Sequence, residues 1–270
     1  MLIAQISDTH IREPGQLCCG RVDTATFLAK AVAKLNSLPR RPDVVIVTGD
    51  LVDLATPAEY AHLARLLGAL EAPFYLVMGN HDHRERLRAA FPEHDYLGVR
   101  GSFVQYAVES FAVRLLVLDT NVPNQSAGRL CEERLAWLAA KLTEQPDRPT
   151  VVAMHHPPFA TGNTACDRFA LAGSDGLARV IANHTNIHAI VSGHLHRATQ
   201  ARFAGTLAMT CPSTAHQLHF GLGDSPFGFD LEPPAFQLHL WAGNVLVTHS
   251  VLVDRFEGPY SFEDGQPISA

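Results

Sequence analysis

Apolar runs suited to buried strands alternate along the chain with segments of helical spacing. The runs are LIAQIS from Leu2, DVVIVT from Asp43, FYLVM from Phe74, TVVAM from Thr150 and IHAIVS from Ile187. Between them, apolar residues recur at three- and four-residue intervals near 22–37, 57–70, 83–91, 131–143 and 174–184. Strands that alternate with helices form largely parallel sheets, so an α/β fold is expected.

Other stretches predict antiparallel strands. The run FVQYAVESFAVRLLVLDT at 103–120 reads as two strands joined by a turn at Glu109–Ser110. After about Arg197 the helical spacing stops, and ARFAGTLAMT and FQLHLWAGNVLVTHSVLV read as β-hairpins. No repeat or low-complexity linker interrupts the chain. We therefore expect a single domain over 1–270, with the polar motifs described below in 1–197 and the hairpins, with a candidate cap or lid, in 198–270.

The composition is that of an ordinary globular protein. Of the 270 residues, 47% are hydrophobic and 18% are charged. The apolar start MLIAQIS meets Asp8 at once, and no segment approaches the roughly 20 uncharged residues that span a bilayer. A cytoplasmic protein with no membrane partner is expected. The five cysteines form no CxxC pair and are odd in number, which favours reduced thiols over a disulfide framework or a zinc–thiolate site.

The charge balance bears on partners and chemistry. The net charge is −6, and no cluster of Lys or Arg occurs. Because DNA and RNA are bound through many phosphate-neutralising cations, extended nucleic acid is not an expected partner. The chain has 15 histidines. Histidine is the commonest metal ligand and transfers protons near neutral pH, so this excess favours a metalloenzyme.

Each of the five apolar runs is followed by a polar motif. The motifs are DTH, GD, GNHD, HHPP and GHLH. In open α/β sheets ligands bind outside the carboxyl ends of the strands, so donors on five such ends converge on one place. Each motif alone is weak, whereas all five in this order predict a metal site. The candidate ligands are Asp8, His10, Asp50, Asn80, His155, His194 and His196.

These donors indicate two metal ions. Seven oxygen and nitrogen ligands without a thiolate exceed what one tetrahedral zinc takes, and they suit Mn, Fe, Co or Zn. Asp50 is the candidate bridge, because each set of ligands needs an anionic member. Two divalent ions, two carboxylates and a bridging hydroxide leave one positive charge, which matches a singly charged phosphodiester. The neutral ligand Asn80 fits this balance, since a third carboxylate would remove the attraction.

The ordered motifs resemble those of the calcineurin-like metallophosphoesterase superfamily over Met1 to about His196. ISDTH, RPDVVIVTGDLVD, PAEY, MHHPPF, GTLAMTCPSTAHQ and GPY are similar to the class III cyclic nucleotide phosphodiesterases, in particular the glycerophosphodiesterase-like group. The resemblance implies a four-layer fold, a two-sheet β-sandwich flanked by helices. It also implies that one metal binds Asp8, His10, Asp50 and His196, and the other Asp50, Asn80, His155 and His194.

Three further residues are candidates for catalysis or substrate binding. His81 follows the ligand Asn80 and is expected to contact the phosphoryl group or donate a proton to the leaving alkoxide; the alternative is that it only supports the ligands. Asp53 is expected to orient His81, unless it is a surface carboxylate at a helix start. The resemblance places His216, in STAHQ, near the substrate, with a buried structural histidine as the alternative.

We therefore expect a dinuclear metal-dependent phosphodiesterase that hydrolyses a 3',5'-cyclic nucleotide or a glycerophosphodiester by attack of a metal-bound hydroxide. Phosphoprotein phosphatases resemble one another in GDxVDRG, whose arginine grips a dianion, whereas this chain has Leu54 at the arginine position. That favours diesters, with a promiscuous phosphomonoesterase or phosphonate esterase as the alternative, and a nuclease or a non-catalytic scaffold less favoured. The segment 221–234 is a candidate lid, offering Phe227 or Phe229 to a base, or a subunit contact. A homo-oligomer is expected by analogy alone.

Overall fold

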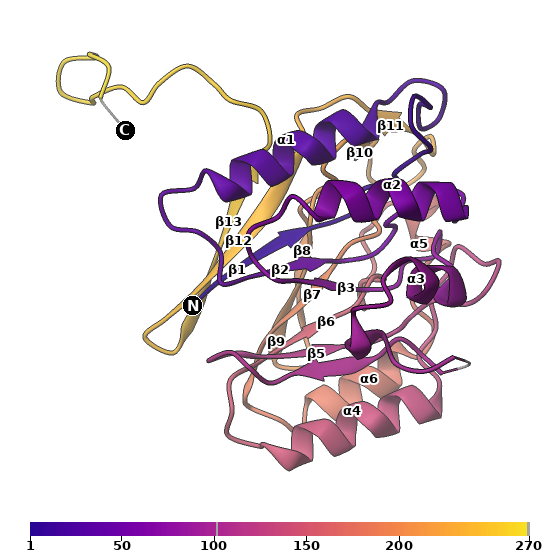
Figure 1. The fold of residues 1–270 in the computed structure, drawn as a ribbon. Coiled ribbons are helices and arrows are strands. Elements are labelled where there is room, and N and C mark those ends of the chain that lie inside the picture. The colour runs from indigo at the N-terminus through magenta and orange to yellow at the C-terminus, as the bar shows by residue number, and fades with distance from the viewer. Residues whose placement is uncertain (101, 269–270) are drawn as a thin grey trace.

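Two β-sheets lie face to face in the computed structural model, which describes residues 1–100 and 102–268 (Figure 1). The first sheet has the order β13-β12-β1-β2-β3, with bounds Val245–Leu252, Ala235–Ala242, Leu2–Ile6, Val44–Val47 and Phe74–Leu76. The second has the order β4-β5-β6-β7-β9-β8, with bounds Tyr106–Val108, Arg114–Val117, Thr150–Ala153, Ile187–Ser192, Thr206–Thr210 and Gln200–Phe203. A small ladder joins β10 (Gln217–Leu218) to β11 (Phe229–Asp230).

Helices cover the outer faces of both sheets. Helices α1 (Thr24–Asn36), α2 (Pro57–Leu67) and α3 (Arg84–Ala90) lie with the first sheet, whereas α4 (Glu132–Glu144) and α6 (Ser174–Ile181) lie on the second (Figure 1). One apolar core joins the first sheet to α1, α2 and the inner face of the second sheet. Another core lies between the second sheet and α4 and α6. The expected sandwich of two sheets flanked by helices is confirmed.

The chain's own signals set several of these elements. Helix α2 begins with a capping box in which Thr56 and Glu59 each accept from the other's backbone N–H, and Pro57 occupies its first turn. The hairpin β12–β13 turns through Gly243 and Asn244, whose φ angles of 57° and 63° match the turn that joins two twisted strands. The runs Leu2–Ile6 and Val44–Val47 are wholly buried, as expected for parallel strands covered on both faces.

The C-terminal hairpins complete the two sheets. β8 and β9 extend the second sheet beside β7, and β12 pairs antiparallel with β1 in the first. Two short helices, α5 (Thr164–Asp167) and the 3₁₀ turn η1 (Asp95–Leu97), were not predicted from the sequence. They are too short to show a helical period. The single-domain assignment over 1–270 stays a prediction.

Two other expectations concern the whole chain. All five cysteines are free thiols. Among the described residues, no helix is both long enough and apolar enough to cross a bilayer.

Candidate metal centre

The carboxyl ends of β1, β2, β3, β6 and β7 meet between the two sheets and bring the seven candidate ligands together. The backbone is left-handed at five of them, with φ between 40° and 71° at Asp8, His10, Asp50, His194 and His196. Such angles are unfavourable for residues other than glycine and cluster at functional sites, where the surrounding structure holds them in place. The local strain is thus concentrated on the candidate ligands.

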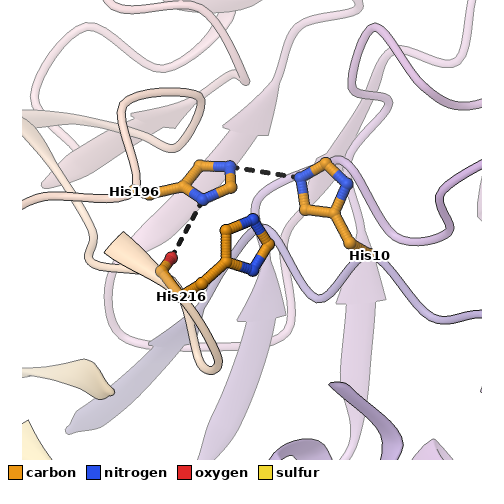
Figure 2. Close-up of side chains that lie close together, drawn as sticks. All are labelled: His10, His196 and His216. Atoms are coloured by element: carbon orange, nitrogen blue, oxygen red, sulfur yellow. Dashed lines mark hydrogen bonds between the residues drawn. The ribbon is translucent and has the colours of Figure 1, made fainter. Parts of the chain in front are cut away.

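We call Asp8, His10, Asp50 and His196 the first half-site. The Nε2 atoms of His10 and His196 face each other at 3.1 Å (Figure 2). His10 Nε2 lies 3.7 Å from Asp50 Oδ2, and His196 Nε2 lies 3.5 Å from Asp8 Oδ1. All four side chains are nearly or fully buried.

The second half-site consists of Asp50, Asn80, His155 and His194. Asn80 Oδ1 lies 3.1 Å from His155 Nε2 and 3.0 Å from His194 Nδ1. His155 Nε2 is also 3.4 Å from Asp50 Oδ2, the oxygen that faces His10 in the first half-site. One carboxylate oxygen therefore faces both half-sites, which is the arrangement expected of a bridging ligand.

The hydrogen bonds around the rings test whether these donors fit a cation. His155 Nδ1 lies 2.8 Å from the carbonyl oxygen of Thr48, and His196 Nδ1 lies 3.0 Å from that of His216. Because a carbonyl only accepts, each Nδ1 carries a proton, and in the neutral form of each ring the lone pair of Nε2 faces the carboxylates. Atoms bound about 2.1 Å from one ion lie roughly 3.0–3.5 Å apart. The donor distances in the two half-sites lie in this range except for that between His10 Nε2 and Asp50 Oδ2, which is slightly longer at 3.7 Å. The residues fit two divalent cations.

Burial and mutual charge shift the pKa values of these groups. Burial raises the pKa of Asp8 to about 6. Burial acts in the same direction on Asp50, but the nearby rings of His155, His81 and His10 outweigh it and lower its pKa well below the usual range. Burial lowers the pKa of His155, yet the charge of Asp50 outweighs this and raises it to about 9. With no cation bound, His155 would therefore hold a proton at neutral pH beside the Asp50 carboxylate, where a cation would bind.

His81 stands apart from the candidate ligands because its side chain is 38% exposed. Its backbone N–H donates to Asp50 Oδ1 at 2.9 Å, and its Nδ1 lies 2.7 Å from the carbonyl oxygen of Asp53. Nδ1 therefore carries the ring proton in the neutral form, which leaves Nε2 without a backbone partner and able to face a bound molecule.

Asp53 contacts the site in a different way from the one expected. Its carboxylate lies 3.4 Å from Nδ1 of His10 and accepts from Arg12 at 2.8 Å, whereas it is 3.7 Å from Nδ1 of His81. It is the backbone carbonyl of Asp53 that orients His81, while the carboxylate faces a candidate metal ligand and an arginine.

His216 lies beside the first half-site, with its ring centroid 4.7 Å from that of His196 and 5.5 Å from that of His10 (Figure 2). It is 5% exposed, and its Nδ1 has no hydrogen-bond partner. Burial lowers its pKa to about 3, so it is neutral. The ring of Phe229 packs on it at 5.2 Å, whereas Phe227 is 58% exposed and packs on Phe169.

Asp82, the last residue of GNHD, supports the site but was not predicted from the sequence. Its buried carboxylate accepts from the backbone N–H groups of Gly79 and Leu51 and from the hydroxyl of Tyr60. Burial raises its pKa to about 7. These bonds fix the loop that carries Asn80 and His81. The available signal was an aspartate two residues after a candidate ligand, in a turn short enough to need an internal acceptor.

His156 adjoins the candidate ligand His155 and lies beyond strand β6, which ends at Ala153. It is not a ligand in either half-site, because both of its ring nitrogens have other partners, at 2.7 Å from Thr120 Oγ1 and 3.1 Å from the carbonyl of Ser126. His83 caps α3, where its ring accepts from the backbone N–H of Arg86.

The fold and the site define a class of protein. The profile of the calcineurin-like phosphoesterase family matches residues 1–198. The chain belongs to this family, and the resemblance noted in its sequence is confirmed.

Individual relatives are similar over nearly the whole chain. A probable glycerophosphodiester phosphodiesterase GpdQ of Arcobacter nitrofigilis is 35% identical, over 99% of this chain and 100% of its own length. A probable cyclic nucleotide phosphodiesterase of Rhodopseudomonas palustris is 39% identical, over 98% and 97%. Among solved structures, a dimetal phosphatase from Danio rerio superposes with a TM-score of 0.70 at 16% identity, covering 94% of this chain and 98% of its own, which shows a shared fold.

Proposed function

We propose that this protein is a dinuclear metal-dependent phosphodiesterase that hydrolyses small phosphodiesters. The observation that carries the proposal is the pair of half-sites that share Asp50 Oδ2, 3.7 Å from His10 Nε2 and 3.4 Å from His155 Nε2. Family membership and the similarity to enzymes named as phosphodiesterases support it.

The two half-sites would each hold one divalent ion, with Mn, Fe, Co and Zn as the candidates that suit nitrogen and oxygen ligands. When bound, two such ions supply Lewis acidity at the phosphoryl oxygens and acidify bound water. The protein's part is to hold seven donors in fixed geometry. Thr48 and the carbonyl of His216 orient the rings of His155 and His196 for that purpose.

The charges beside the site favour a singly charged substrate. Leu54 is 59% exposed at the position where phosphoprotein phosphatases carry an arginine. Arg12 is paired with Asp53 at 2.8 Å and lies 3.5 Å from Glu59, so its positive charge is compensated by these two carboxylates. A phosphomonoester dianion would thus lack the additional cation that a diester does not need.

His81 is the candidate general acid. With Nδ1 bonded to a carbonyl, its Nε2, when protonated, would donate a hydrogen bond to the phosphoryl oxygen or deliver the proton to the leaving alkoxide. His216 is the candidate substrate contact, since its unpartnered Nδ1 lies beside the first half-site. Phe229 supports the ring of His216, and the segment 221–234 is the candidate lid.

The two substrate classes suggested by the relatives are glycerophosphodiesters and 3',5'-cyclic nucleotides. The experiment compares kcat/KM of the Mn-reconstituted protein for glycerophosphocholine and cyclic AMP, with p-nitrophenyl phosphate as the monoester. A preference above about tenfold, or about 1.4 kcal/mol in transition-state binding, assigns the class. Faster hydrolysis of the monoester than of both diesters would overturn the diesterase proposal.

Two expectations about the whole protein accompany this function. A cytoplasmic location suits small soluble phosphodiesters, and a homo-oligomer is expected by analogy with glycerophosphodiesterase-like enzymes. Both stay predictions. Sedimentation velocity of the purified chain measures the second directly.

A further inference from the structure

Two buried side-chain amides cross from one sheet to the other beside the candidate metal centre. Gln5 lies on β1 in the first sheet, and Asn121 follows β5 in the second. They are 0% and 3% exposed. Each donates to a backbone carbonyl of the opposite sheet or its strand-end loop, next to a candidate ligand, and neither has been given a role so far.

Gln5 ties β1 to the ends of β2 and β7. Its Nε2 donates to the carbonyl of Ser192 at 2.9 Å and to the hydroxyl of Thr48 at 2.9 Å. Ser192 is the last residue of β7, two positions before His194. The carbonyl of Thr48 accepts from His155. One amide therefore fixes the strand end that leads to His194 and the residue that orients His155.

The ends joined by Gln5 are packed without spare room. A Cβ atom on Gly193 would lie closer than 3.0 Å to Ser7, to the Asp8 carboxylate and to the Thr48 carbonyl. The backbone N–H of His194 donates to both oxygens of Asp8, at 3.0 and 3.1 Å. Because these contacts are direct, a change in the spacing of β1 and β7 moves Asp8 relative to His194.

Asn121 holds the loop after β3 from the other sheet. Its Nδ2 donates to the carbonyls of Gly79 at 2.6 Å and Asp82 at 3.2 Å, which flank the candidate ligand Asn80. Asn121 is itself fixed, since its backbone N–H donates to Asp119 at 2.9 Å and its carbonyl accepts from Arg84 at 2.8 Å.

Both half-sites need this spacing, because each takes ligands from both sheets. In the first, His196 comes from the end of β7 and the other three from the first sheet; in the second, His155 and His194 face Asp50 and Asn80 across the gap. We propose that Gln5 and Asn121 are positioning residues that set the distance between the sheets at which each half-site binds its ion. The inference rests on the proposed dinuclear site, but not on the substrate.

The experiment removes each amide without changing its volume and measures metal binding. Gln5→Met and Asn121→Leu replace the amides with apolar side chains of similar size. The control is Gln237→Met. Gln237 is another buried amide that joins the sheets, donating from β12 to the carbonyl of Thr210 on β9 at 3.1 Å, and neither residue adjoins a candidate ligand. Mn²⁺ binding to the chelator-treated proteins is followed by titration calorimetry, with thermal unfolding of the metal-free proteins measured in parallel.

We expect Gln5→Met and Asn121→Leu to bind Mn²⁺ about 10–100-fold more weakly than wild type. Losses of this size follow when a residue that orients a metal ligand is removed. Gln237→Met should bind within about threefold of wild type, whatever its loss of thermal stability. Wild-type affinity in both variants, or an equal loss in the control, would overturn the inference. If Asn121→Leu does not fold, Asn121→Ser is used in its place. The serine keeps one hydrogen-bond donor on a shorter side chain, and the same loss of Mn²⁺ affinity is expected.

Failure of the proposed function gives a different pattern. A wild-type chain that binds two Mn²⁺ ions but cleaves no diester would contradict the phosphodiesterase, while the affinities of the variants still decide the role of the amides. A wild-type chain that binds no Mn²⁺ would overturn both.

Discussion

Among single residues, His81 has surroundings that suit direct contact with a substrate, because its side chain is 38% exposed while five of the seven candidate ligands are buried. His81→Ala is expected to lower kcat for the preferred diester by about 10²–10⁴-fold, since it removes a general acid. Bound metal should be unchanged. His83→Ala, two residues along in the exposed cap of α3, is the matched control and should keep its rate. A fully active His81→Ala protein with its metal bound would exclude a catalytic role.

Asp50 carries the prediction of a shared ligand. Because Asp50 Oδ2 faces a histidine of each half-site, removing the carboxylate should weaken the binding of both ions and not of one alone. Asp50→Asn is expected to retain at most one Mn²⁺ per chain after gel filtration, by elemental analysis, while Asp23→Asn, in the exposed cap of α1, retains the wild-type content. Two ions retained by Asp50→Asn would mean that Asp50 is not the bridge.

At the scale of elements, the turns that end the strands are held by close packing of glycine. A Cβ atom on Gly79 would lie closer than 3.0 Å to the backbone nitrogen and the carboxylate of Asp50. Gly79→Ala should therefore cost about 1–3 kcal/mol of unfolding free energy, as overpacking does, and reduce Mn²⁺ affinity. Gly228→Ala, where the added Cβ meets nothing within 4 Å, is the control. Urea unfolding of both variants measures the difference, and equal stabilities would contradict the packing argument.

The same elements show what sequence could predict. The candidate ligands could be predicted from the sequence because each strand-end motif is local. Parallel strands bring their carboxyl ends to one edge of the sheet, so the motifs meet regardless of how the loops between them run. The roles of Gln5 and Asn121 could not be predicted from the sequence. Each resembles an ordinary strand or loop residue, because its partners, on β7 and in the loop after β3, are brought opposite it only by the fold. The sequence predicted that Asp53 orients His81. It could not indicate that the backbone carbonyl of Asp53, and not its carboxylate, contacts the His81 ring.

For the whole molecule, acid stability should depend on His239, a buried residue of β12 away from the candidate ligands. Its ring lies 3.0 Å from Gln5 Oε1 and 2.8 Å from Thr248 Oγ1, and burial lowers its pKa to about 4 from 6.5. The unfolded chain thus binds a proton that the folded chain excludes. The stability is fully present above pH 6.5 and is lost as the pH falls toward 4.

The size of this effect can be isolated by a pair of variants. The loss from His239 should approach about 1.4 kcal/mol per pH unit, about 3 kcal/mol in all. Urea unfolding of the metal-free protein between pH 7 and 4 should show a shallower decline for His239→Gln than for wild type. His249→Gln, on the exposed neighbouring strand β13, should follow wild type. Parallel curves for wild type and His239→Gln would contradict the assignment.

The central claim is that two ions held between the sheets are required for diester hydrolysis. The most direct measurement titrates Mn²⁺ into the chelator-treated protein while the hydrolysis of bis(p-nitrophenyl) phosphate is followed and bound metal is counted. The account predicts that the rate continues to rise until two ions are bound per chain and returns to background when the metal is removed. A rate that is complete with one ion, or that survives full removal of metal, would contradict it.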